Sequence, residues 1–140
     1  MFNFEKLEIW QEAMALVEEV YALSQGFPQR ERYGLTAQLR RSAISIPSNI
    51  AEGSGKRTKK EFLQFAYTAR SSLLELVTQV KIARNLGLLD DKSADEVLSM
   101  MERLYAKICN FIKYLSGGRK NSKKSTVNGE PLAVNGANCA

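Results

Sequence analysis

Hydrophobic residues recur every three or four positions over four long stretches of the chain, which is the repeat of an amphipathic α-helix. The first stretch runs from about residue 4 to residue 25 and places Trp10 and Val17 on its inward face. The other stretches cover about residues 31–54, 59–86 and 91–115. Sustained alternation of apolar and polar residues, which marks β-strands, is absent from the sequence. The pattern therefore predicts helices only.

The residues that flank these stretches are typical of helix ends. Thr58 followed by Glu61 fits a capping box, in which the Thr58 side chain accepts a hydrogen bond from the start of the helix. Gly87 supplies the left-handed conformation that commonly ends a helix. Pro47 lies inside the second stretch and removes a backbone hydrogen bond, so we expect a kink or a local break at about residues 43–46.

Short connections place successive helices side by side in opposite directions. We therefore expect an all-α fold, an antiparallel up-down-up-down four-helix bundle, over residues 1–116. Residues 117–140 begin with two glycines and continue as a basic, polar segment with few apolar residues. Such a segment buries too little surface to offset its conformational entropy, so we expect a disordered tail.

The composition excludes most familiar enzyme classes. The chain has 140 residues, 44% of them hydrophobic, which suits one soluble domain. Its start lacks signal-peptide features and no apolar run reaches the roughly 20 residues that span a bilayer, so we expect a cytoplasmic protein without a membrane partner. Histidine is absent, and Cys109 and Cys139 are too few for a metal cluster. Because histidine is the usual general base and zinc ligand, we expect no enzyme activity, metal or cofactor.

Positive charge is concentrated in the middle of the chain. Residues 1–27 carry one lysine and five glutamates, a net charge of −4, whereas residues 28–70 carry nine cations and three glutamates, a net charge of +6. The central cations are Arg30, Arg32, Arg40, Arg41, Lys56, Arg57, Lys59, Lys60 and Arg70. Such a basic surface is typical of a nucleic-acid binder that contacts phosphates. The alternative is that Arg40 and Arg41 pair with glutamates of a neighbouring helix and that the lysines form a solvated loop.

The first and fourth helices each carry a second set of apolar residues with a spacing of seven. These are Ile9, Leu16 and Leu23 in the first helix and Leu98, Tyr105 and Ile112 in the fourth. Residues seven apart lie on one side of a helix. Each set therefore predicts an exposed strip at which one subunit meets the next. The alternative is that both sets fill a thick core.

Residues 32–62 read RYGLTAQLRRSAISIPSNIAEGSGKRTKKEF. This segment resembles the four-helix-bundle family of bacterial proteins that are encoded in intervening sequences of large-subunit ribosomal RNA genes. The opening FEKLEIWQEAMALVEEVY and the later FLQFAYTARSSLLELVTQV resemble it too, so that the similarity covers about residues 2–116. It implies a ring-shaped homopentamer with a basic surface and no known catalytic activity.

The same family is similar to the accessory proteins of diversity-generating retroelements, pentamers that bind nucleic acid and a reverse transcriptase. Our leading hypothesis is thus a non-enzymatic, oligomeric scaffold that binds RNA or DNA. The alternative is an adaptor that binds an acidic protein partner, such as a reverse transcriptase or a ribosome-associated factor.

Overall fold

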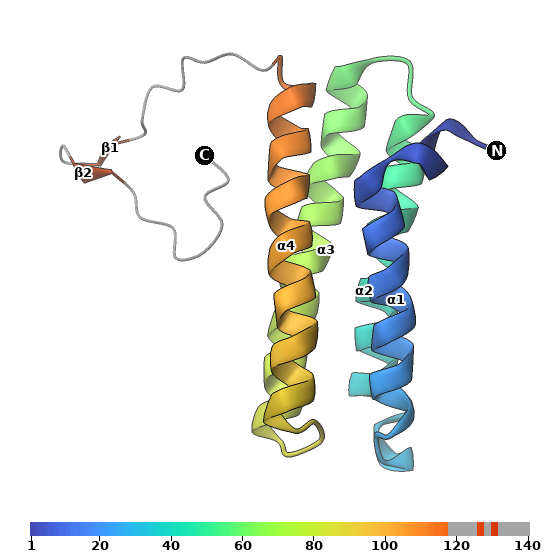
Figure 1. Ribbon diagram of the computed structural model, residues 1–140, viewed down its shortest axis with the longest axis vertical. Helices are drawn as coiled ribbons and strands as arrows, with labels where there is room; N and C mark the ends of the chain where they lie inside the picture. The colour runs from blue at the N-terminus through green and yellow to red at the C-terminus, as the bar shows by residue number, and fades with distance from the viewer. Residues whose placement is uncertain (118–125, 128–129, 132–140) are drawn as a thin grey trace.

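The computed structural model describes residues 1–117, 126–127 and 130–131 (Figure 1). Their α-helices are α1 (Glu8–Gln25), α2 (Leu35–Ser54), α3 (Lys59–Asn85) and α4 (Asp91–Leu115). The short 3₁₀ helices η1 (Asn3–Lys6) and η2 (Gln29–Glu31) precede α1 and α2. Two short strands, β1 (Thr126–Val127) and β2 (Glu130–Pro131), form an antiparallel pair.

The long helices stand side by side along the long axis of the molecule (Figure 1). Each packs against the helix before and after it in the chain, and α4 also packs against α1. The α1–α2 and α3–α4 connections lie at the lower end of Figure 1, and the α2–α3 connection lies at the upper end. The four helices confirm the predicted all-α class over residues 1–117.

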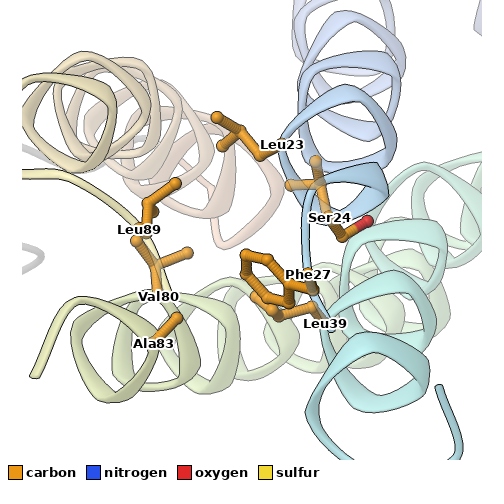
Figure 2. A pocket seen from close by; sticks show the side chains of 8 residues that line it. Leu23, Ser24, Phe27, Leu39, Val80, Ala83 and Leu89 are labelled. Atoms are coloured by element: carbon orange, nitrogen blue, oxygen red, sulfur yellow. The ribbon is translucent and has the colours of Figure 1, made fainter. Parts of the chain in front are cut away.

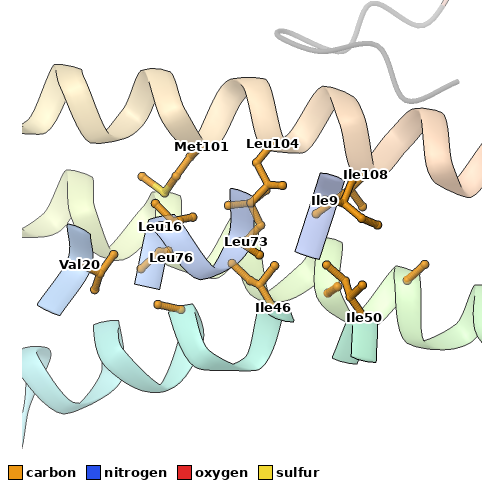
Figure 3. Close-up of a cluster of buried hydrophobic side chains, with 14 of the residues drawn as sticks. Ile9, Leu16, Val20, Ile46, Ile50, Leu73, Leu76, Met101, Leu104 and Ile108 are labelled. Atoms are coloured by element: carbon orange, nitrogen blue, oxygen red, sulfur yellow. The ribbon is translucent and has the colours of Figure 1, made fainter. Parts of the chain in front are cut away.

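One hydrophobic core runs between the helices (Figure 3). Its largest fully buried side chains come from all four helices and include Leu16, Ile46, Leu73, Met101 and Leu104. Burying a side chain of this size contributes roughly 1.5–3 kcal/mol relative to leaving it in water. The packing of this core therefore supplies most of the stability of the four helices.

The predicted interface strips are part of this core, and their predicted exposure is wrong. Leu16 is only 1% exposed, and Ile9 and Ile112 are also buried. The remaining members, Leu23, Leu98 and Tyr105, are half-buried against the core. Figure 3 shows Ile9 and Leu16 among core side chains of the other helices. The alternative, that these residues fill a thick core, describes them correctly.

The face of α1 that points into the core is not the predicted one. Because α1 packs against both α2 and α4, its central face carries the Ile9 and Leu16 positions, and Trp10 and Val17 are only half-buried beside α2. Apolar residues occupy both adjoining faces of this helix, so periodicity alone did not distinguish them.

The predicted helix ends are largely confirmed. The Thr58 hydroxyl accepts a 3.1 Å hydrogen bond from the Glu61 N–H at the start of α3. Gly87 has φ of +74° and follows the end of α3. The start of α4 has a matching cap, since the Asp90 carboxylate accepts a 2.8 Å bond from the Ser93 N–H. These bonds satisfy backbone donors that a helix leaves open at its first turn.

Helix α2 continues through Pro47, so it lacks the predicted local break. The predicted kink at this position remains a prediction. The Asn49 amide donates 2.7 Å to the Ser45 carbonyl, one turn back. The Ser45 hydroxyl also lies 2.8 Å from the Ser72 hydroxyl of α3. Small polar side chains thus connect α2 to α3 next to the proline.

The predicted disordered tail, residues 117–140, falls mostly outside the described residues. The strand pair β1–β2 lies within it, in a segment where the sequence predicted no regular structure. Among the described helices, none combines the length and apolar character that crossing a membrane requires.

Candidate nucleic-acid interface

The nine predicted cations do not form one continuous patch. Helix α2 has 20 residues, which at 1.5 Å per residue separates its two ends by about 30 Å. Four of the cations lie beyond its C-terminal end, and we call Lys56, Arg57, Lys59 and Lys60 the loop cluster. Three others lie at or near its N-terminal half, and we call Arg32, Arg40 and Arg41 the groove cluster.

The four residues of the loop cluster are exposed, and two of them lie over aromatic rings. The Lys56 ammonium lies 4.9 Å from the centre of the Phe65 ring, and the Lys59 ammonium lies 4.3 Å from the centre of the Tyr114 ring. Contacts of a cation with a ring face contribute about 0.5–1 kcal/mol at exposed sites. They orient the two lysines while their charges stay in water.

Gly53 allows α3 to pack closely against the end of α2, next to the loop cluster. A Cβ atom at this position would lie 2.5 Å from the Phe62 ring and 2.7 Å from the Phe65 Cβ atom. The backbone of α2 therefore touches the first turns of α3 directly. This contact fixes the position of the aromatic rings under the loop.

The groove cluster lies on α2 and just before it, facing α1, and Arg40 is its best-anchored member. The Arg40 Nε donates a 2.8 Å hydrogen bond to the Ser24 hydroxyl, and its guanidinium carbon lies 4.4 Å from the centre of the Tyr21 ring. Ser24 is buried at the edge of the core, and Figure 2 shows its oxygen directed away from Val80 and Leu89. Arg40 is thus held by α1 through a hydroxyl group and a ring.

Arg32, Arg40 and Arg41 line a shallow hollow of about 520 Å³ between the α1 and α2 surfaces. The guanidinium carbon of Arg32 lies 5.4 Å from the centre of the Tyr33 ring. Tyr33 is 88% exposed, and Arg41 is exposed as well. The structure therefore combines three guanidinium groups and two tyrosine rings in one hollow.

The other two predicted cations do not line the hollow and are not part of the loop cluster. Arg30 is exposed in η2, which precedes α2. Arg70 is half-buried on α3, with its guanidinium carbon 5.1 Å from the Tyr67 ring centre. Arg70 lies eleven positions after Lys59 in α3, which places it roughly 16 Å away along the axis.

The ion pairs within residues 1–117 are formed by other side chains. Arg84 pairs with Asp95 at 3.8 Å, and the Lys107 ammonium bridges Glu8 and Glu12 of α1. Hydrogen bonds from Lys107 to these two carboxylates, first of all Glu12, raise the pKa of its ammonium group. None of the loop-cluster or groove-cluster cations pairs with a carboxylate of the described chain. The alternative in which Arg40 and Arg41 pair with glutamates is therefore wrong for these residues.

The apolar cavity of Figure 2 offers no room for a substrate. It has a volume of about 10 Å³ and is lined by side chains such as Val20, Phe27 and Leu39. A volume of this size corresponds to about one water molecule. Nor does the described part of the chain bring together three side chains that are suited to hold a metal ion.

Comparison with known proteins identifies a family that the chain matches. A family model described as 23S rRNA-intervening sequence protein matches residues 5–110, from η1 through most of α4. No curated protein matches the chain. The matched range contains all nine central cations and lies within the segment whose resemblance was noted in the sequence.

Proposed function

Because the chain belongs to the 23S rRNA-intervening sequence protein family, we propose that it is a non-enzymatic scaffold that binds nucleic acid through the phosphate backbone. The loop cluster and the groove cluster supply the contacts. Cations that contact phosphates position a protein on nucleic acid without recognising its base sequence. The proposed binding is therefore independent of base sequence.

The observation that carries this proposal is the set of seven clustered cations without a carboxylate partner in the described chain. A cation that already pairs with a carboxylate would lose that partner on binding phosphate. An unpaired, solvated cation instead releases condensed counterions from the nucleic acid, which favours binding at low salt. The unpaired cations thus suit a phosphate surface.

Titration by fluorescence anisotropy tests the proposal. The full chain is titrated against a structured RNA and a DNA duplex at several salt concentrations between 50 and 200 mM. For a duplex, each phosphate contact makes the slope of log affinity against log salt concentration steeper by about 0.9. Affinity for both ligands is therefore expected to fall steeply with salt. A parent chain that binds neither ligand at low salt contradicts the proposal and favours the adaptor for an acidic protein.

Charge reversal shows whether the loop cluster contributes. Lys56, Arg57 and Lys60 are changed to glutamate together, which removes the contact of Lys56 with Phe65 and keeps that of Lys59 with the Tyr114 ring of α4. The control variant reverses Lys81, Lys92 and Arg103, which are exposed elsewhere on the bundle. The first variant is expected to lose most of its affinity and about three units of salt slope. Equal losses in both variants would show that only total charge matters.

We also propose that the bundle is antiparallel, up-down-up-down, and that it self-associates into the homopentamer that the family resemblance implies. Exposed apolar side chains support self-association, because a monomer gains nothing from them. Met14 of α1 and Ile44 of α2 are 38% and 42% exposed and line one shallow groove, and Leu74 and Ile82 are exposed about two turns apart on α3. These surfaces replace the buried strips as candidate contacts between subunits.

A further inference from the structure

The hollow that holds the groove cluster differs in chemistry from the loop cluster. Its lining includes the rings of Tyr21 and Tyr33 together with the three guanidinium groups. In the loop cluster the cations that lie over rings are lysines, and their rings, Phe65 and Tyr114, are less exposed than Tyr33. The hollow therefore offers a stacking surface as well as charge, and the two regions are suited to different parts of a nucleic acid.

Tyr33 is the most unusual side chain of the hollow. It lies just before α2, and its 88% exposure leaves the ring largely in water. The guanidinium carbon of Arg32 lies over this ring, 5.4 Å from its centre. A flat ring that stays solvated beside cations is the arrangement on which bases of single strands stack.

The charge around the hollow is favourable for a phosphate. No acidic residue lies in the first turn of α2. The Glu31 carboxylate, however, accepts a 3.4 Å hydrogen bond from the N–H of Leu35, the first residue of that helix, so the positive charge for a phosphate comes from the guanidinium groups and not from the helix end. A second carboxylate, Glu75, lines an adjoining hollow with Arg41. Neither forms an ion pair with the groove cluster.

The size of the hollow also fits a small ligand unit. Its volume of about 520 Å³ lies within the range of small-molecule sites in proteins, roughly 300–1,000 Å³. It is a shallow surface hollow between two helices, so a chain that continues on both sides can enter it. A base within a duplex is already stacked on its neighbours and cannot present its face to a ring.

We propose that this hollow binds an unpaired nucleotide of single-stranded RNA or DNA. The base stacks on Tyr33, Arg32 and Arg41 bind the adjacent phosphates, and Arg40 holds the Tyr21 side of the hollow through its bond to Ser24. This assignment rests on the proposed function and names its ligand more closely. It gives the protein a preference for loops and strand ends over regular duplex.

Replacing Tyr33 tests the assignment. The full-length Tyr33→Leu variant is titrated against a single-stranded oligouridine and a duplex of the same length, under one salt condition. We expect about a ten-fold loss of affinity for the single strand and less than a two-fold change for the duplex. Tyr33→Phe keeps the ring and is expected to bind both as the parent does. Phe2→Leu, which removes a 71% exposed ring that belongs to neither cluster, serves as the control.

A crosslinking measurement gives a second readout. Irradiation of the complex with an oligonucleotide that carries 5-iodouridine is expected to attach the base to Tyr33, as mapped by mass spectrometry. Unchanged single-strand affinity in Tyr33→Leu, or an equal loss for the duplex, would overturn the assignment while leaving the scaffold proposal intact. Failure of the parent chain to bind either ligand would overturn both. Binding of polyglutamate that depends on Tyr33, without nucleotide binding, would assign the hollow to an acidic protein.

Discussion

Single residues determine the geometry of the loop cluster. Gly53 is buried where α2 meets α3, and the space that a side chain would need is occupied by the rings of Phe62 and Phe65. Phe62 in turn packs edge-on against Phe111 of α4, with ring centres 5.1 Å apart. A change at this glycine would therefore move aromatic side chains that connect three helices.

We expect Gly53→Ala to destabilise the protein by about 1–3 kcal/mol, the usual effect of overpacking a well-filled core. Thermal unfolding followed by circular dichroism measures the change. Gly55→Ala is the matched control, because a Cβ atom there meets only the Glu52 carbonyl oxygen at 3.5 Å. That variant is expected to stay within about 0.5 kcal/mol of the parent. If Gly53→Ala unfolds at the parent temperature, the close contact is not rigid.

At the scale of the helix, side-chain caps mark where α3 and α4 begin. Asp90 accepts hydrogen bonds from both the backbone N–H and the hydroxyl of Ser93. These bonds, led by the one from the Ser93 N–H, lower the pKa of the Asp90 carboxyl group below its usual value of 3.8. The carboxylate is favoured in the folded state because it satisfies a donor at the start of α4 and interacts with the helix dipole.

The stabilisation by Asp90 is expected to depend on pH. Since the folded-state pKa is lowered, the contribution is complete above the unfolded value and disappears as the pH falls through the folded one. Asp90→Ala is thus expected to lower the unfolding temperature at pH 6 and to have a smaller effect near pH 2. Thr58→Ala removes a cap that does not titrate, so its effect should be similar at both pH values. A constant effect of Asp90→Ala would contradict the role of its charge.

At the scale of the whole molecule, the bundle leaves apolar side chains exposed on separate helices. Met14 and Ile44 flank the outer side of α1 and α2, where Trp10 and Pro47 also line a groove of about 360 Å³. Leu74 and Ile82 lie on α3, which does not pack against α1 within the described residues. Two different surfaces that meet head to tail form a ring when the rotation closes.

Light scattering on the parent chain is expected to give about five times the chain mass of 15.7 kDa, as the family resemblance implies. Met14→Glu combined with Ile82→Glu should reduce the mass toward that of a monomer, because a charge is costly at a buried contact. The control places glutamate at Gln25 and Thr68, which are exposed polar positions on the same two helices. A monomeric parent at micromolar concentration would contradict the ring.

The sequence alone determined the features that depend on neighbouring residues. The helical repeat, the Thr58 cap and the end of α3 at Gly87 were all predictable, because a backbone hydrogen bond or a left-handed φ involves residues only a few positions apart. The concentration of positive charge could also be read directly, and the segment from Arg32 to Phe62 already pointed to the family.

Only the tertiary structure decided which surfaces face each other. Ile9 and Trp10 are equally apolar neighbours, and the position of α1 between α2 and α4 buries the first and leaves the second half-buried. The bond of Arg40 to Ser24 joins residues 16 positions apart. The length of α2 likewise separates the cations into two clusters. Such features depend on how whole helices pack, and hydrophobic periodicity specifies that a face is buried without specifying its partner.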